Sequence, residues 1–425
     1  MFGWEFPPHI TGGLGTACYG LTKALLGKGV EIIFVVPKAY GDEHSESARI
    51  INASDIPVDI FDKNFSEYWK MVTMIEIGSN LIPYADPEYF KYLSALYSNS
   101  SEVSESKILT KYYTFSGRYG KDLMEEVARY ALVASSIARN NDFNVIHSHD
   151  WLTYPAGIAA KQISGKPLIV HVHATEFDRS GENINQNVYD IERKGMYAAD
   201  KVITVSNRTR DIVINRYNID PAKVVTVHNA VKYPDYIEKL RNNKSFEDKI
   251  VSFVGRVTFQ KGPDYYVEAA HKVLLKDPRA RFVMAGEGDM LYRMIRRVAQ
   301  LKIADRFHFT GFLNSKEVDR LFALSDVYVM PSVSEPFGIS PLEAMYSDVP
   351  VIISKQSGVS EILNYALKVD FWDIDAIADA IYGLLHYNAL SEFFKKYGRA
   401  EVENMKWDKV GSKVNEIYHR VAEIQ

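Results

Sequence analysis

Cysteine is nearly absent from this sequence: Cys18 is the single one among 425 residues, so no disulfide can form within the chain. One thiol fits a reducing compartment, and we expect a cytoplasmic protein. The sequence also lacks an apolar run long enough to span a bilayer and lacks a signal peptide, so we expect no integral membrane segment. The first predicted strand is very short, and we hypothesise that the native chain starts a few residues upstream of Met1.

An excess of charge of one sign is missing as well. Lys and Arg together number 50 and Asp and Glu number 54, which gives a formal net charge of −4. This balance provides no broad basic field, so we expect no nucleic-acid partner. Apolar residues make up 47% of the chain and charged residues 24%, as in ordinary soluble globular proteins. The length suggests about two to three domains.

Short β-rich runs alternate with helical patterns along most of the chain. Most of the runs are apolar on both faces, as strands of a helix-covered parallel sheet should be. We therefore predict an α/β fold of two Rossmann-like, doubly wound domains, separated by the polar segment 231–249 and followed by a terminal helix at 407–424. The predicted strands are 31–36, 144–149, 167–174, 201–206 and 223–229 in the first half, and 249–256, 281–288, 306–312, 325–332, 349–355 and 366–372 in the second.

The segment from about 40 to 120 is less regular and rich in aromatic residues. One interpretation is a small subdomain whose rings fill a core, because aromatic side chains dominate burial. The other is a set of exposed rings that stack against sugars, and both can hold in part. The aromatic residues concerned are Tyr68, Trp69, Tyr84, Tyr89, Phe90, Tyr92, Tyr97, Tyr112, Tyr113 and Phe115.

Glycines follow the first predicted strand. Gly12 and Gly13 precede a helix, where glycine lets the backbone approach an anion and free N–H groups favour negative charge. The loop is either such a site or an ordinary tight turn. It lacks the dinucleotide fingerprint, because Cys18 stands where a third glycine or alanine would be. An NAD-dependent oxidoreductase is therefore disfavoured.

Two cations follow the first predicted strand of the second half. Arg256 ends the run and Lys261 comes five residues later, in a loop that restarts a helix. Ligands of open parallel sheets bind beyond the carboxyl ends of the strands. A planar guanidinium and a point-charge ammonium at that edge suit a pair of phosphates, although loop cations are often simply solvated.

Four histidines lie on two neighbouring predicted strands. His171 and His173 flank Val172, and His147 and His149 repeat the pattern. We expect the two histidines of each strand to face opposite sides of the sheet, one in the core and one in the cleft. Two histidines per face without a third ligand do not make a zinc site, so we expect no metal.

Two glutamates stand eight positions apart in the stretch SEPFGISPLEAM. Glu335 lies in a loop after a strand, and Glu343 lies one turn into the next helix, which Gly338, Ile339 and Ser340 introduce. Free N–H groups at that helix start can hold a phosphate. A carboxylate accepts hydrogen bonds from vicinal hydroxyls, so a ribose or hexose is a natural ligand. Helix-dipole chemistry, about 0.3–1 kcal/mol, explains Glu343 alone but not Glu335.

The ordered set of motifs resembles the retaining nucleotide-sugar glycosyltransferases of the GT-B fold, most closely glycosyltransferase family 4 and the glycogen and starch synthases. Glu335 and Glu343 match the E-x7-E motif of that family. Further matches in family order, over nearly the whole chain, are FPPHITGGLGT, HSHDW, HATEFDR, ADKVITVS, VHNAV, VGRVTFQKG, AGEGDM, FTGFL and SVSEPFGISPLEAM.

The resemblance implies a domain plan and a set of roles. Two domains would face each other across a cleft: an acceptor-side domain at 1–235 that carries the aromatic insert, and a nucleotide-sugar domain at 236–405. The helix at 406–425 would pack back on the first. The implied catalytic residues are His173 beside the donor sugar, Arg256 and Lys261 at the donor diphosphate in place of a metal, and Glu335 at the sugar hydroxyls. The implied donor-binding residues are Gly12, Gly13, Gly338, Ile339, Ser340 and, at the ribose, Glu343.

The resemblance implies retaining transfer of a hexose, glucose in the first instance, from ADP- or UDP-glucose to a carbohydrate acceptor, with no cofactor. An α-glucan acceptor is expected, but Ile10 and Thr11 stand where the synthases usually carry a lysine. A transferase acting on a small sugar or a surface polysaccharide therefore stays open. A non-catalytic carbohydrate-binding protein is a remote alternative.

Overall fold

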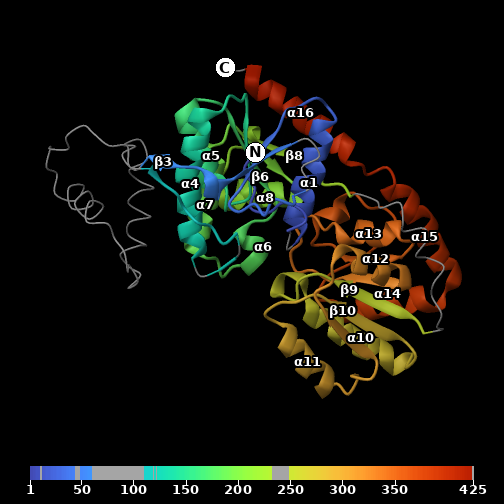
Figure 1. The fold of residues 1–425 in the computed structure, drawn as a ribbon. Coiled ribbons are helices and arrows are strands. Elements are labelled where there is room, and N and C mark those ends of the chain that lie inside the picture. The colour runs from blue at the N-terminus through green and yellow to red at the C-terminus, as the bar shows by residue number, and fades with distance from the viewer. Residues whose placement is uncertain are drawn as a thin grey trace, which may run out of the picture.

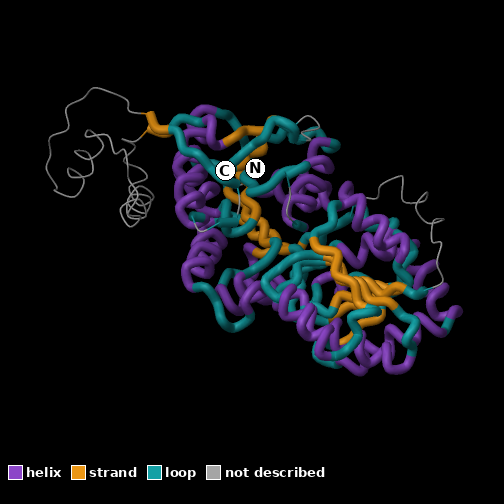
Figure 2. Tube along the Cα trace, turned by 60° about the horizontal axis from the view of Figure 1, so that its bottom comes forward, coloured by secondary structure: helices purple, strands orange, loops and turns teal. Residues whose placement is uncertain are grey.

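The computed structural model describes residues 1–9, 12–43, 48–59, 110–117, 119–120, 122–231 and 248–423. Two parallel sheets, each covered by helices on both faces, make up the two halves of the chain (Figures 1 and 2). Every strand expected from the sequence lies within its predicted run. The α/β class with two Rossmann-like sheets is therefore confirmed.

The first sheet has the order β5-β6-β7-β8, and isolated bridges from Phe2 to Val35 and to Ser148 connect it to the parallel pair β1-β2. The predicted short first strand is thus a few residues around Phe2. The strands are β1 (Ile33–Val36), β2 (Arg49–Asn52), β5 (Ile146–His149), β6 (Leu168–Val172), β7 (Lys201–Thr204) and β8 (Val224–Thr226), with the separate antiparallel pair β3 (Val58–Asp59) and β4 (Thr110–Lys111).

Helices cover both faces of this sheet because its strands are apolar on both sides. Val170 and Val202 pack with α4, α5, α7 and α8 in one core, whereas Ile169 and Ile203 pack with α1 and α16 in another. The helices are α1 (Gly13–Leu26), α4 (Leu123–Asn140), α5 (Tyr154–Ser164), α6 (Glu176–Ser180), α7 (Gln186–Ala198), α8 (Asn207–Tyr217) and α16 (Trp407–Glu423).

The second sheet has the order β11-β10-β9-β12-β13-β14, and all its pairs are parallel. Its strands are β9 (Ile250–Val254), β10 (Arg281–Ala285), β11 (Phe307–Gly311), β12 (Val327–Met330), β13 (Val351–Ser354) and β14 (Leu367–Val369). Helices α10 (Pro263–Lys276), α11 (Leu291–Gln300) and α14 (Ile374–His386) pack on one face, and α12 (Ser315–Leu324), α13 (Ser340–Tyr346) and α15 (Asn388–Val402) on the other.

The last helix lies far in sequence from the sheet that it covers. Helix α16 follows the second half but packs against α1 of the first, as Figure 1 shows. The fit is close, because Gly20 faces the Trp407 ring and Gly411 faces Ala24. Tyr418 on α16 also contacts His147 of β5, with 2.6 Å between the Tyr418 hydroxyl and the His147 Nδ1.

Replacing Gly20 with alanine tests this packing. A Cβ there would lie 2.3 Å from Cε2 of Trp407. We expect the free energy of unfolding to fall by about 1–3 kcal/mol, the usual cost of overpacking. Gly27→Ala is the matched control, because the nearest atom to its added Cβ is the Ala24 carbonyl oxygen, 3.5 Å away. Urea unfolding followed by circular dichroism measures both, and an unchanged Gly20→Ala midpoint would contradict the packing.

Only part of the aromatic segment lies within the described residues. Tyr113 and Phe115 are buried in the first-half core, whereas Tyr112 is exposed. The other seven aromatic residues fall in 60–109, outside the described part, as does the predicted domain boundary near 235. The domain plan therefore stays a prediction.

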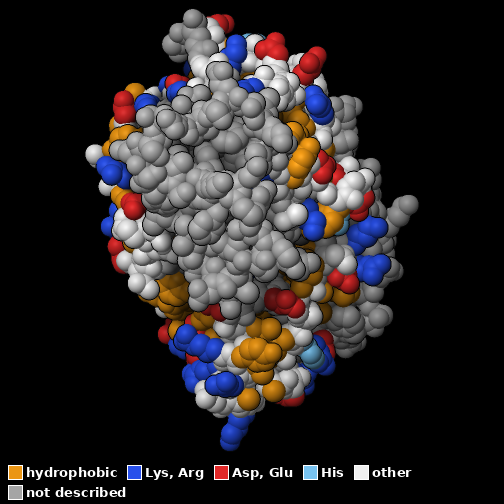
Figure 3. All heavy atoms as spheres, turned by 60° about the vertical axis from the view of Figure 1, so that its left-hand side comes forward, with side chains coloured by type: hydrophobic (Ala, Val, Ile, Leu, Met, Phe, Trp, Pro, Cys, Tyr) orange, Lys and Arg blue, Asp and Glu red, His pale blue; other side chains and the backbone are white. Residues whose placement is uncertain are grey.

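The described surface and helices bear on membrane and nucleic-acid partners. On the face drawn in Figure 3, the described acidic and basic side chains are mixed with one another. Among the described residues, no helix is long and apolar enough to cross a membrane.

Candidate active site

The second sheet reverses its strand order between β9 and β12. Strands β10 and β11 continue on one side of β9, and β13 and β14 on the other side of β12. Ligands of doubly wound sheets bind at such a switch point, beyond the carboxyl ends of the strands. Arg256 lies two residues after β9, and Glu335 lies five residues after β12. The two loops predicted to carry the chemistry therefore meet at the switch point.

An ion pair joins these loops. The Lys261 ammonium donates to Oε2 of Glu335, which also accepts from the Ser332 hydroxyl at 3.3 Å. The Glu335 side chain is buried and the Lys261 side chain is about one-fifth exposed. The loop sits close to β12 because Gly262, at φ +65°, has no Cβ: one would lie 2.1 Å from the Pro331 carbonyl oxygen. The predicted cation and the predicted carboxylate are thus in contact.

Arg256 has a different environment from Lys261. Its side chain is exposed, and its Nη2 donates to Oε1 of Gln260 at 3.3 Å. A guanidinium held by one amide oxygen can reorient toward an anion without breaking a buried pair. Lys261 is therefore the fixed cation of the site, and Arg256 is the accessible one.

The turn into α13 carries the remaining second-half residues. Gly338 has φ +98°, and a Cβ there would lie 3.2 Å from Cγ of Glu335, so glycine suits both the turn and the close carboxylate. Ile339 is the N-cap and Ser340 the first helical residue, both partly buried. Burial raises the pKa of the Glu343 carboxyl to about 7, and the nearby Asp319 adds to the rise.

The raised pKa of Glu343 predicts a stability gain on neutralising it. Between about pH 4.5 and 7 the folded chain holds a proton that the unfolded chain has lost, so stability falls as the pH rises through this window. Glu343→Gln should raise the free energy of unfolding at about pH 8 by about 1–2 kcal/mol, after allowance for partial exposure. At about pH 4.5 the two proteins should differ little. If the free energies of unfolding of the two proteins differed equally at both pH values, the raised pKa of Glu343 would be contradicted.

The first half presents its glycine loop at the start of α1. Gly12 is the N-cap and Gly13 the first helical residue, so the helix begins one residue earlier than predicted. Both glycines are exposed, and a Cβ at either would meet no described atom within 4 Å. The open space leaves the backbone N–H groups accessible. No contact that joins these glycines to the residues of the second half is described.

His173 lies just beyond the carboxyl end of β6 and is held from two sides. Its backbone N–H donates to Oδ1 of Asp150 at 2.7 Å, and its Nε2 lies 3.1 Å from Nδ1 of His149. Burial lowers the pKa of His173 to about 3 and raises that of Asp150 to about 6. At neutral pH the imidazole is therefore uncharged, and it can exchange hydrogen bonds with a ligand but cannot supply a positive charge.

The expectation that the histidines alternate between faces is wrong. Residues two apart on a strand point to the same side, so all four histidines face the α1 and α16 layer. His147 stacks on His149 and His171 on His173, each pair with ring centroids 4.3 Å apart. Burial lowers the pKa of each of them. The argument against a zinc site assumed at most two histidines on each face of the sheet, and this assumption is therefore wrong as well.

Contacts between the halves bring the His173 loop to the Glu335 loop. The Ser334 hydroxyl donates to Oδ1 of buried Asp178 on α6 at 2.6 Å and accepts from Nη2 of Arg208 at 3.0 Å. Helix α6 begins two residues after Ala174, and Gly181 at its end approaches the Phe259 ring. The three loops that carry His173, Lys261 and Glu335 therefore converge.

A second contact lies beside the first. The Glu361 carboxylate accepts from the backbone N–H groups of Asn207 and Arg208 at 2.9 and 2.7 Å, and it lies 3.1 Å from Nε2 of His228. Sequence reasoning missed these residues and Asp178, Ser334 and Asp150. The signals were the Thr175–Asp178 capping box and the aspartate of HSHDW, whereas Glu361 has no local pattern.

Comparisons with known proteins agree with this geometry. A family model described as the starch synthase catalytic domain matches residues 1–222, and one described as glycosyl transferases group 1 matches 236–401. An uncharacterized glycosyltransferase of Methanocaldococcus jannaschii is 27% identical over 98% of this chain and 97% of its own length. The glycogen synthase of Mycobacterium tuberculosis is 23% identical over 98% and 93%.

Solved structures share the fold over the full length. Sucrose-phosphate synthase from Thermosynechococcus elongatus is 18% identical with a TM-score of 0.71, over 98% of this chain and 95% of its own. The Anabaena protein HepE, in a crystal structure with UDP-glucose, is 15% identical with a TM-score of 0.65, over 97% of each chain. The chain therefore belongs to the starch synthase catalytic domain family and is a glycogen synthase-like glycosyltransferase with the GT-B fold.

Proposed function

We propose that this chain transfers glucose from ADP- or UDP-glucose to an α-glucan, with retention at the anomeric carbon and without a metal. The observation that carries the proposal is the convergence of Lys261, Glu335 and His173 at the switch point, with exposed Arg256 beside them. The similarity to a glycogen synthase supports the acceptor class, and the UDP-glucose complex of HepE supports the donor class.

The residues have distinct tasks in the bond-breaking step. Cleavage of the sugar–phosphate bond leaves negative charge on the diphosphate and positive charge on the sugar ring. Cations at the diphosphate stabilise the first charge, and this is the task of the fixed Lys261 and the accessible Arg256. The carboxylate of Glu335 accepts from the sugar hydroxyls and stabilises the second. The acceptor attacks from the face that the diphosphate leaves, and the leaving phosphate takes its proton.

The first half supplies the opposite wall of the site. His173 is uncharged, so it bonds to a sugar hydroxyl without repelling the developing ring cation. Gly12 and Gly13 offer backbone N–H groups to the donor phosphate, as do Ile339 and Ser340 across the cleft. Glu343 accepts from the ribose hydroxyls. Closure of the two halves excludes water and limits donor hydrolysis.

Nucleotide affinity should depend on the ionisation of Glu343. Because its pKa lies at about 7 in the free protein, the ribose-accepting carboxylate forms only above that pH. We expect the dissociation constant of UDP-glucose or ADP-glucose, whose diphosphate does not titrate in this range, to rise up to about tenfold for each pH unit below 7. In Glu343→Gln the slope should vanish. Calorimetric titration at several pH values measures both proteins, and an equally steep slope in the variant would place the titrating group elsewhere.

The proposal is tested by product analysis. Radiolabelled ADP-glucose and UDP-glucose are incubated with glycogen or with small sugars, in the presence and absence of a chelator. We expect label in glycogen, an α-anomeric proton signal in the product, and no loss of activity on chelation. A β-linked product would overturn retention, and activity lost on chelation would overturn the metal-free assignment. No nucleotide release from any sugar donor would support a binding protein instead.

A small-sugar or surface-polysaccharide acceptor is the second candidate. The residues that favour it are Ile10 and Thr11, which stand where the glucan synthases usually carry a lysine. Label that enters small sugars but not glycogen in the same experiment decides for this candidate.

A further inference from the structure

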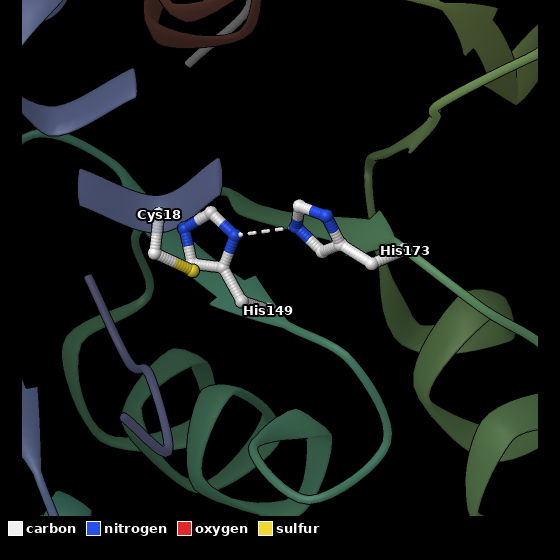
Figure 4. A group of neighbouring side chains, drawn as sticks. All are labelled: Cys18, His149 and His173. Atoms are coloured by element: carbon white, nitrogen blue, oxygen red, sulfur yellow. Dashed lines mark hydrogen bonds between the residues drawn. The ribbon is translucent and has the colours of Figure 1, made fainter. Parts of the chain in front are cut away.

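A cysteine and two histidines converge beside the proposed donor site. Cys18 on α1, His149 at the end of β5 and His173 after β6 each place one donor atom within 4.8 Å of the other two. Figure 4 shows the His149 ring between the other two side chains, with its hydrogen bond to His173 dashed. Cys18 and His149 are fully buried, whereas His173 is partly exposed. One member of the cluster is therefore partly accessible to solvent.

The spacing is close to that of a zinc site. Two nitrogens bound to zinc at about 2.0–2.1 Å with a tetrahedral angle lie about 3.3 Å apart. Nδ1 of His149 and Nε2 of His173 are 3.1 Å apart. The Cys18 sulfur lies within 4.8 Å of one nitrogen of each histidine, and tetrahedral zinc sets sulfur and nitrogen about 3.5 Å apart. Three protein ligands leave a fourth position open to water or another ligand.

The donor atoms have the chemistry that zinc requires. Imidazole nitrogen and cysteine sulfur are the ligands that zinc binds most often in proteins. Nε2 of His149 is buried and has no hydrogen-bond partner among the described residues. His171, stacked on His173, likewise leaves both ring nitrogens without one. These unpartnered nitrogens belong to the same buried cluster, but they are not Nδ1 of His149 and Nε2 of His173, the two nitrogens that would bind the ion.

We propose that Cys18, His149 and His173 form a binding site for one Zn²⁺ ion, and that this ion competes with the donor sugar for His173. Binding releases the Cys18 thiol proton to solvent and leaves a thiolate on the metal. The one proton between the two imidazoles moves to the outer nitrogen of the ring that carried it, because the other ring already carries its proton on its outer nitrogen. His173 then cannot bond to the sugar through its metal-bound nitrogen. The competition rests on the proposed function, whereas the ion site itself does not.

Cobalt substitution tests the site without an activity measurement. Co²⁺ is added to the metal-free protein, and the absorption spectrum is recorded. A thiolate ligand gives a near-ultraviolet charge-transfer band, and tetrahedral coordination gives strong visible bands. Because Cys18 is the only cysteine in the chain, such a charge-transfer band can come from no other residue. We expect both bands at one equivalent of Co²⁺ and their loss on adding Zn²⁺. Absence of the charge-transfer band in the wild-type protein overturns the proposal.

Two variants separate this site from surface binding. Cys18→Ser should remove the charge-transfer band and weaken Zn²⁺ binding at least about tenfold, because a direct ligand matters no less than its outer-shell partners. His308→Gln is the matched control, because His308 is an exposed histidine on β11. It should keep the wild-type spectrum and affinity. Equal Zn²⁺ affinity in Cys18→Ser and wild type would show surface binding and overturn the site.

The competition has its own readout. In the wild-type protein Zn²⁺ should inhibit transfer, and a chelator should restore it. In Cys18→Ser inhibition should need at least about ten times more Zn²⁺. If the cobalt bands appear but no sugar donor supports transfer, the zinc site is supported and the proposed function is overturned. Inhibition that is equally strong in Cys18→Ser would overturn the competition.

Discussion

Arg256→Ala should lower turnover about a hundredfold or more, while the fold stays intact. One contact to a developing oxyanion is typically worth roughly 3–4 kcal/mol in the rate. The Arg256 side chain is exposed and donates to a single amide oxygen, so its removal leaves no buried charge behind. Steady-state turnover with the preferred donor and the thermal unfolding midpoint are measured together. The turnover of Arg256→Ala should fall, and its thermal unfolding midpoint should equal that of the wild type.

A matched surface arginine provides the control for Arg256. Arg279 is also exposed and lies near a carboxylate, with 3.7 Å between its Nε and Oδ1 of Asp277. Arg279→Ala should leave turnover within about twofold of the wild type, as surface substitutions away from a site usually do. If Arg256→Ala kept full turnover, Arg256 would have no part in the reaction and the diphosphate site would lie elsewhere.

Lys261→Ala should cost both activity and stability. The same oxyanion argument predicts a loss of turnover of about a hundredfold or more. In addition, the buried Glu335 carboxylate would lose its cation and keep only Ser332 among the described partners. Breaking a buried pair from one side costs about 3–5 kcal/mol, and because Lys261 is partly exposed we expect about 2–3 kcal/mol. Turnover and urea unfolding measure the two effects.

A double variant separates the two effects of Lys261. Replacing the pair by Lys261→Met and Glu335→Leu removes both charges and keeps similar volumes, which is often neutral for stability. We expect unfolding to return to within about 1 kcal/mol of the wild type while transfer stays undetectable. If transfer recovered together with stability, the pair would be a structural feature of the fold and the roles given to Lys261 and Glu335 would be wrong.

The strand pattern predicted the fold because a strand that is buried on both faces can be recognised from its own apolar residues. The central residues of runs such as 249–256 and 349–355 are mostly apolar on both faces, as expected for strands of a helix-covered parallel sheet. Strands β2, β3 and β4 were missed. They are short, lie within the irregular aromatic segment and lack such runs. The family resemblance was confirmed because its motifs follow in order over nearly the whole chain.

The candidate site was only partly accessible from the sequence. Arg256, Lys261 and Glu335 follow strands, and the carboxyl ends of parallel strands share an edge, so their neighbourhood could be predicted. The sequence could not show whether each cation is fixed or accessible, because the partner of Lys261 lies 74 positions away in the chain. The expectation about the four histidines was wrong for a different reason. Their spacing alone shows that they share a face, and the expectation applied the strand period wrongly.

By itself the sequence determined the α/β class, most of the strands, the family and the loops that carry charge. These depend on local periodicity and on residue types at strand ends, which neighbouring residues specify. Tertiary structure alone decided that Ser334 meets Asp178, that Glu361 caps α8, and that Cys18 lies beside His149 and His173. Such contacts join residues more than a hundred positions apart, and they depend on how helices and sheets pack rather than on any pattern within one segment.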